Sequence, residues 1–148
     1  MVVEFADPEW DGNRIPKGQQ CKKFGGNGST PALRVSNTPV GANAIVIKFN
    51  DLSYGPMTNG GRGTVGWKIG DVSETVLLSV PGGTNELPEG TWLERRNRAT
   101  GAWTSPGYLP PCSGGNLNKY VATVIAVQMD GGDVAEQLAE TDITMGKY

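Results

Sequence analysis

Residues 105–127 read SPGYLPPCSGGNLNKYVATVIAV, and this stretch indicates the fold more clearly than any other part of the chain. Its first half cannot form regular structure, because three prolines fix φ and remove backbone donors while three glycines favour positive φ. Its second half, Tyr120–Val127, is an unbroken run rich in β-branched residues and long enough for a buried strand. A rigid loop therefore leads directly into a core strand. Such a loop either holds polar groups at the mouth of a pocket or simply connects two strands at the surface.

The rest of the chain also favours strands. Short apolar or alternating segments between turn residues predict strands at 32–36, 44–49, 64–69, 76–80, 91–98 and 142–148. The arginines of 91–98 suit an edge strand, where charge resists aggregation. One helix is expected at Asp133–Thr141, with an N-cap at Gly132-Asp133 and with Val134 and Leu138 on one face. We therefore expect a mainly β protein with about eight short strands and one C-terminal helix.

Composition limits the function classes. The 148 residues are expected to form a single domain, 1–148, and the net charge of −2 argues against nucleic acid or an anionic membrane as partner. No apolar stretch is long enough for a transmembrane segment. The N-terminus lacks the charged and apolar regions of a signal peptide, so we expect a cytoplasmic protein, or a secreted one whose signal was removed.

The chain contains no histidine. This excludes histidine-based acid–base catalysis, Ser-His and Cys-His nucleophile pairs, and ordinary zinc sites, and we expect no metal and no cofactor. Cys21 and Cys112 are the only cysteines. A disulfide between them would close a long loop and stabilise the fold by up to roughly 4–5 kcal/mol, whereas in the cytosol they would be two free thiols. Both alternatives remain open from the sequence.

Four segments, in order, resemble the phosphatidylethanolamine-binding protein (PEBP) family, which includes the Raf kinase inhibitor proteins and smaller bacterial and fungal members. The first is Ile15-Pro16 leading to Cys21 and residues 26–33, similar to the opening of the family. The others are residues 38–51, with a Pro-Gly turn, core strand and Asn50-Asp51; residues 108–120, with Tyr108, Pro110, Pro111 and Tyr120; and residues 138–148. The resemblance covers about residues 14 to 148.

The resemblance implies an antiparallel β-sandwich of two sheets with a C-terminal helix. It also implies a small pocket near the ends of the central strands, which in relatives takes phosphate-like or other anionic head groups. Carried over residue by residue, Asn50 or Asp51 stands at the aspartate position of the family, and Pro110, Pro111 and Tyr120 match directly. Trp67 and Tyr108 are expected as further walls of this ligand-binding site.

Both pocket histidines of the family are missing. Asn118 stands in place of the second, and the first corresponds to Arg62 or to Gly66, depending on which glycine-rich segment is its counterpart. Asn118 can donate and accept hydrogen bonds but cannot titrate, and Arg62 would supply a fixed positive charge. The pocket either persists with a different ligand or has decayed. The loop at Tyr54–Met57 and the segment with Trp92 and Trp103 are expected to extend apolar walls.

Two functions follow from these expectations. The first is a non-catalytic binding module whose partner is a small organic or anionic molecule, held by Asn50, Asp51, Arg62, Trp67, Tyr108, Pro110, Pro111, Asn118 and Tyr120. The alternative is an enzyme that works by shape and hydrogen bonding, such as a cyclase, pericyclase or dehydratase in natural-product biosynthesis. Its catalytic candidates are Asp51 as base and Asn118, Arg62 or Tyr120 as donor. A protein-inhibitor role rests on family analogy alone.

Overall fold

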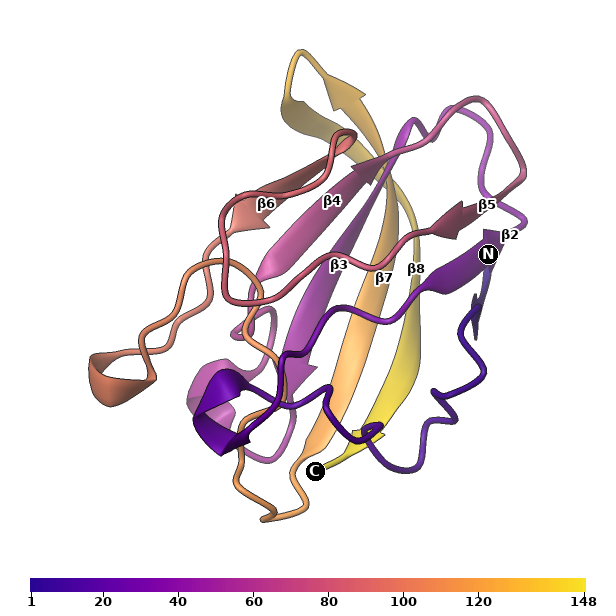
Figure 1. The fold of residues 1–148 in the computed structure, drawn as a ribbon. Coiled ribbons are helices and arrows are strands. Elements are labelled where there is room, and N and C mark those ends of the chain that lie inside the picture. The colour runs from indigo at the N-terminus through magenta and orange to yellow at the C-terminus, as the bar shows by residue number, and fades with distance from the viewer.

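The computed structural model describes all 148 residues, and eight strands in two antiparallel sheets make up its regular structure. The smaller sheet has the order β1-β2-β5, with bounds Val2–Phe5, Leu33–Ser36 and Glu74–Leu77. The larger sheet has the order β6-β4-β3-β7-β8, with bounds Thr91–Arg95, Thr64–Lys68, Ala44–Asp51, Lys119–Asp130 and Asp133–Lys147. Three single 3-10 turns interrupt the loops: η1 (Lys22–Phe24), η2 (Gly55–Met57) and η3 (Gly101–Trp103). In Figure 1 the strands of the smaller sheet lie at the right, beside the larger one.

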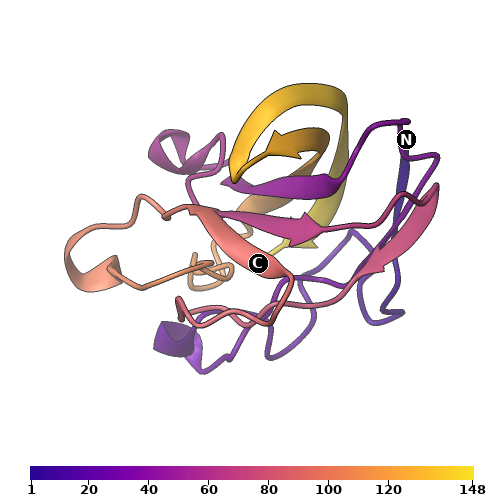
Figure 2. The same cartoon turned by 90° about the horizontal axis from the view of Figure 1, so that it is seen from above.

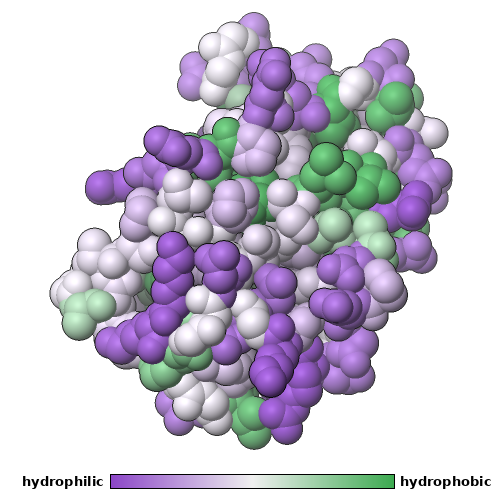
Figure 3. Space-filling model, viewed as in Figure 1, coloured by the Kyte–Doolittle hydropathy of each residue, from purple (hydrophilic) through white to green (hydrophobic).

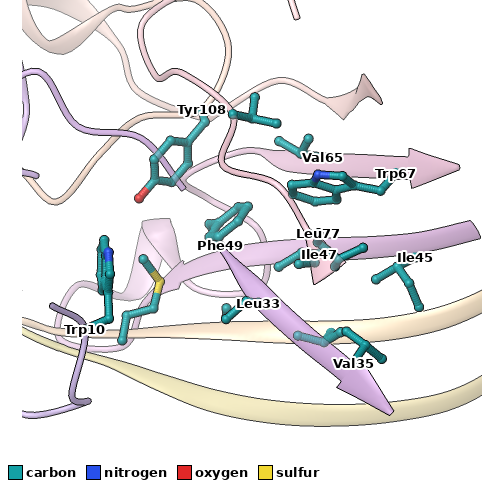
Figure 4. Close-up of a cluster of buried hydrophobic side chains, with 14 of the residues drawn as sticks. Trp10, Leu33, Val35, Ile45, Ile47, Phe49, Val65, Trp67, Leu77 and Tyr108 are labelled. Atoms are coloured by element: carbon teal, nitrogen blue, oxygen red, sulfur yellow. The ribbon is translucent and has the colours of Figure 1, made fainter. Parts of the chain in front are cut away.

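The main core lies between the two sheets. Leu33 and Val35 of β2 point into it from one side, and Ile45, Ile47 and Phe49 of β3 point into it from the other (Figure 4). These residues alternate along their strands because successive side chains of a strand point to opposite faces. Burying each large aliphatic side chain stabilises the fold by about 1.5–3 kcal/mol. The apolar residues that alternate in the sequence therefore form the contact between the two sheets.

The predicted C-terminal helix is wrong. Residues 133–147 instead form the long strand β8, which pairs with β7 along the whole of that strand. Gly131 and Gly132 have φ of 62° and 104°, the positive values that a two-residue hairpin turn between Asp130 and Asp133 requires. An isolated helix of this length is marginal in water, whereas the hairpin satisfies the backbone groups of β7. No helix of the structure is long enough to cross a membrane.

Cys21 and Cys112 form a disulfide, with their Cα atoms 5.3 Å apart. The bond ties the segment before η1 to the loop that precedes β7. The backbone reinforces this link, because Cys21 N–H donates to the carbonyl of Pro111 at 2.9 Å. The irregular loop of residues 105–118 is therefore held near its middle by the disulfide and at its C-terminal end by β7.

Hydrophobic side chains also reach the outer surface of the smaller sheet. In the view of Figure 3 they gather over β5 and the loop before it. Val72, Val76 and Leu78 are the exposed apolar residues of this stretch. Of these, Val76 belongs to β5 and lies on the far side of the strand from the core residue Leu77, as the alternation of a strand requires.

Candidate functional site

The candidate site forms where three loops meet at the end of β3. Asp51 is the last residue of β3 and lies directly opposite Tyr120 of β7. The loop after β3 carries η2 and Arg62, and the loop before β7 carries the proline pair and Asn118. Because β3 and β7 are neighbours in the sheet, segments far apart in the sequence meet at this edge.

Asp51 and Asn118 contact each other directly. Asn118 Nδ2 donates to Asp51 Oδ2 at 2.9 Å, and the N–H of Ser53 donates to Asp51 Oδ1, also at 2.9 Å. The backbone of Asn118 is fixed by two hydrogen bonds with Tyr148, of 2.9 and 3.1 Å. The carboxylate is only 3% exposed, so these partners replace the water it loses. Both groups are therefore rigidly placed by the fold.

Arg62 is a buried cation without an acidic partner. It is 6% exposed, and the only ion pair in the structure joins Arg34 and Glu74. Its Nε donates to the carbonyl of Leu109 at 3.1 Å, and its Nη2 donates to the carbonyl of Pro110. Burial lowers the pKa of the guanidinium, and the nearby Tyr120, Tyr108 and Asp51 oppose this shift. An arginine nevertheless stays protonated at neutral pH.

A cavity of about 540 Å3 opens in front of Arg62. Its polar lining includes Asp51, Arg62 and Asn118, so the structure brings together three of the predicted site residues. The remaining lining residues come from the loop with η2, from the segment of residues 98–103 that carries η3, and from the loop before β7: Ser53, Tyr54, Pro56, Met57, Arg98, Ala99, Thr100, Trp103, Leu109, Cys112, Ser113 and Asn116. Tyr54, Pro56, Met57 and Trp103 supply the apolar wall that the sequence suggested, whereas Trp92 lies elsewhere.

Asn50 and Trp67 do not line the cavity. Asn50 faces the opposite side of the sheet, where it accepts the N–H of Gly60 at 2.6 Å and donates to Thr123 at 3.0 Å. Trp67 lies in the main core and pairs with Ile45, six residues before Asp51 and thus about 20 Å away along the strand. Its indole N–H donates to the carbonyl of Leu78 at 3.0 Å. Both residues stabilise the fold instead.

Tyr108 is also a core residue. Its ring packs against Phe49 with centroids 4.6 Å apart, and Figure 4 shows its hydroxyl pointing to the side where Trp10 lies. That hydroxyl is the one fully buried side-chain polar atom without a hydrogen bond. Burial raises the pKa of Tyr108 strongly, and Arg62 opposes part of the shift.

Tyr120 and the prolines form the layer behind the cavity. The Tyr120 hydroxyl accepts the N–H of Cys112 at 3.2 Å, and the guanidinium of Arg62 lies 5.5 Å from the centre of its ring. Burial raises the pKa of Tyr120. Pro110 and Pro111 contribute carbonyls to Arg62 and Cys21. Pro110 itself lines a separate, smaller cavity of about 180 Å3 beside Lys22 and Lys23. These residues position the site rather than line it.

Arg98 was not predicted and fixes one wall. Its guanidinium donates to the carbonyls of Pro56, Thr58 and Asn59 and so holds the turn η2 against the segment of residues 98–103. Ser113 and Asn116 were missed as well, because they lie in an irregular loop whose path the sequence does not specify. Of the two residues considered as the counterpart of the first family histidine, Gly66 lies within β4 beneath the ring of Trp92, whereas Arg62 lines the cavity.

Residues 7–146 match the family model described as phosphatidylethanolamine-binding protein. The chain therefore belongs to the phosphatidylethanolamine-binding protein family. Among solved structures it is similar to one described as a homologue of that protein from Chlamydia trachomatis, with 20% identity and a TM-score of 0.55 over 99% of this chain and 95% of that one. At this identity the likeness concerns the fold alone. No curated protein matches the chain. Family and fold together indicate a ligand-binding protein in general terms.

Proposed function

We propose that this protein is a binding module that takes a small organic anion, with a carboxylate or phosphate-like head group, in the cavity of Arg62. The observation that carries the proposal is the state of Arg62 itself. A buried guanidinium that lacks a carboxylate partner is costly, and an anionic ligand would compensate it. Two of its five N–H donors already hold carbonyls, and its Nη1 has no hydrogen-bond partner.

The other walls suit the rest of such a ligand. Tyr54, Met57 and Trp103 offer apolar and aromatic surface beside the polar floor, and the side chain of Asn116 has no internal hydrogen bond that competes with a ligand. The volume of about 540 Å3 lies within the range of small-molecule sites. Because the chain has no histidine, we expect the affinity for a carboxylate ligand, whose own charge is fixed in this range, to be nearly constant between about pH 6 and 8.

The enzyme alternative has no observation in its favour. Asp51, the only base proposed for it, already accepts hydrogen bonds at both oxygens, from Ser53 and Asn118. Tyr120, one of its proposed donors, lies behind the cavity and is not among the lining residues. The binding function is therefore the one we put forward.

Isothermal titration calorimetry with phenyl phosphate, and with phenol as the neutral analogue, tests this proposal. We expect phenyl phosphate to bind and Arg62→Met to weaken it by about tenfold to a hundredfold, since a hydrogen bond to a charged group is worth about 1.5–3 kcal/mol. Near-ultraviolet circular dichroism checks that this variant folds.

A second variant avoids the structural hydrogen bonds of Arg62. Asn116→Asp places a negative charge in the wall of the cavity, and Asn85→Asp makes the same change at an exposed loop position that does not line it. Asn116→Asp is expected to weaken binding of phenyl phosphate and Asn85→Asp to leave it unchanged. Equal affinity of all variants, or equal binding of phenol, would show that the anion is not held at Arg62.

A further inference from the structure

The outer face of the larger sheet carries a second apolar cluster. Ala44, Val46, Ile125 and Val127 are only 1–5% exposed, and Trp92 and Met129 pack against them. They alternate with the residues of the main core, so they point away from the smaller sheet. Neither a third sheet nor a helix lies on this side. These side chains are therefore covered by neighbours in the same sheet, such as Trp92 and Met129, rather than by another layer.

The curvature of the sheet turns this face into a groove. Seen from above, β8 arches over the sheet, and the end of the β7–β8 hairpin faces β6 (Figure 2). The resulting groove of about 650 Å3 has Val46, Ile125 and Val127 in its floor and Val134 and Gln137 in one wall. Residues 94–98 form the other wall.

Trp92 lies next to this groove and continues the second apolar cluster beyond it. Gly66 lies opposite Trp92, and a Cβ there would meet the indole ring at 2.2 Å, so the glycine lets the ring lie across β4. Trp92 and Ala44 line an adjoining groove of about 580 Å3 together with Met129. The indole N–H of Trp92 donates to Glu94 at 2.7 Å, which occupies the carboxylate of Glu94.

A β-bulge directs an arginine into the groove. Leu93 pairs with Val65 and Arg95 pairs with Thr64, so β6 advances two residues while β4 advances one. Leu93 packs against the main core, and regular alternation would turn Arg95 to that same side. Instead, Arg95 lines the outer groove together with its neighbours Glu94 and Arg96. Bulges at sheet edges commonly re-aim side chains in this way.

The groove has the opposite charge to the chain as a whole. Lys48, Arg95, Arg96 and Arg98 line it and Glu94 is its one acidic residue, although the chain carries a net charge of −2. Lys48 bonds to Asn59, and Arg98 bonds to the carbonyls around η2. Arg95 and Arg96 make no side-chain hydrogen bond, and neither takes part in the one ion pair, Arg34–Glu74. Two exposed guanidiniums, those of Arg95 and Arg96, thus stand unpaired at the rim of a groove whose lining is mostly polar and basic.

We propose that this groove binds an acidic, extended peptide segment of a partner protein. Its carboxylates pair with Arg95 and Arg96, and its remaining side chains occupy the groove above Val46, Ile125 and Val127. An extended segment fits because β6 is an edge strand whose only neighbour is β4, and no turn or loop hydrogen bond uses the backbone of residues 92–97. Protection of an edge from aggregation explains charged residues there, but it explains neither the apolar floor nor the bulge.

Fluorescence anisotropy with a labelled short peptide that alternates glutamate and valine tests the proposal. We expect saturable binding that weakens as salt is added, and weaker binding of a peptide that alternates lysine and valine. The double variant Arg95→Glu, Arg96→Glu should lower the affinity at least about tenfold. The matched control, Arg14→Glu with Lys17→Glu, changes the net charge equally at exposed positions outside the groove and should leave the affinity nearly unchanged.

Four results would overturn the proposal. The first two are the absence of saturable peptide binding and an equal loss of peptide affinity in the control variant. The third is that the NMR chemical shifts of backbone amides change around Arg62, and not in β6, when the peptide is added. The fourth is a concentration-dependent dimer that the Arg95, Arg96 variant abolishes. The dimer would identify a second copy of the chain as the occupant, and sedimentation velocity would detect it. The groove and the Arg62 cavity share only Arg98 in their linings, and none of the variants changes Arg98, so the phenyl phosphate titration can succeed or fail separately from this test.

Discussion

The disulfide makes the sharpest stability prediction. Cys21 and Cys112 are separated by 91 residues in the sequence. Closing a loop of this length lowers the entropy of the unfolded chain by about 15.5 cal/mol/K in the loop-closure model, which corresponds to about 4.6 kcal/mol at 25 °C. Proteins of this size are stable by about 5–15 kcal/mol, so the variant Cys21→Ala, Cys112→Ala should lose a large share of its free energy of unfolding.

Urea denaturation followed by tryptophan fluorescence measures this loss. We expect a lower midpoint for the double variant, and a similar shift for the unmodified protein when a thiol reductant is added. The reductant should leave the double variant unchanged, which makes it the control. A difference below about 1 kcal/mol would refute the loop-closure argument for this protein. The backbone hydrogen bond from Cys21 to Pro111 remains in the variant. We therefore expect the free energy of phenyl phosphate binding to change less than the free energy of unfolding.

Three further changes test the assignment of structural roles. Tyr108→Phe should be neutral or stabilising, because it removes a buried hydroxyl without a partner, and thermal unfolding measures the change. The pKa of Tyr108 and of Tyr120 is raised in the folded state, so their contribution to the free energy of unfolding is complete below about pH 10 and declines at higher pH, where the tyrosines of the unfolded chain ionise first. Urea denaturation at several pH values measures this decline, and Tyr108→Phe should make it less steep. Asn50→Ala should cost about 1–3 kcal/mol of stability while calorimetry finds phenyl phosphate binding unchanged, since Asn50 faces away from the cavity. Gly132→Val should cost about 1–2 kcal/mol and speed amide exchange at the β7–β8 turn, because valine is strained at a φ of 104°; unchanged exchange would contradict this role of the turn.

Much of the fold follows from local pattern. The alternation of Leu33 and Val35 and the apolar run of 44–49 predict strands that the structure contains. The unbroken run Tyr120–Val127 likewise lies within β7. The family resemblance correctly indicated the PEBP family, over nearly the same residues as the family model. These patterns suffice because the side-chain period of a strand and the breakers around it are properties of short segments.

The helix prediction failed for a reason that lies outside the segment. Val134 and Leu138 have helical spacing, but Gly131-Gly132 can form a tight hairpin turn, and β7 offers a long row of unpaired backbone groups. The pairing of β7 and β8 satisfies these groups over a greater length than a short helix could. A nine-residue pattern does not contain this information, because the competing partner is another strand.

The sequence by itself determined the strand pattern, the family and the absence of titrating histidines from any site. Only the tertiary structure decided which of Asn50 and Asp51 faces the cavity, that Arg62 lines it, and that Trp67 lies in the core. It also decided that Arg95 turns outward at a bulge. Arg62 lies in the loop before β4, where the path of the loop decides its position, and the three strand positions share one physical reason. Because neighbouring residues of a strand point to opposite faces, a register difference of one residue reverses the role of a side chain, and register is set by the strands that pair with it.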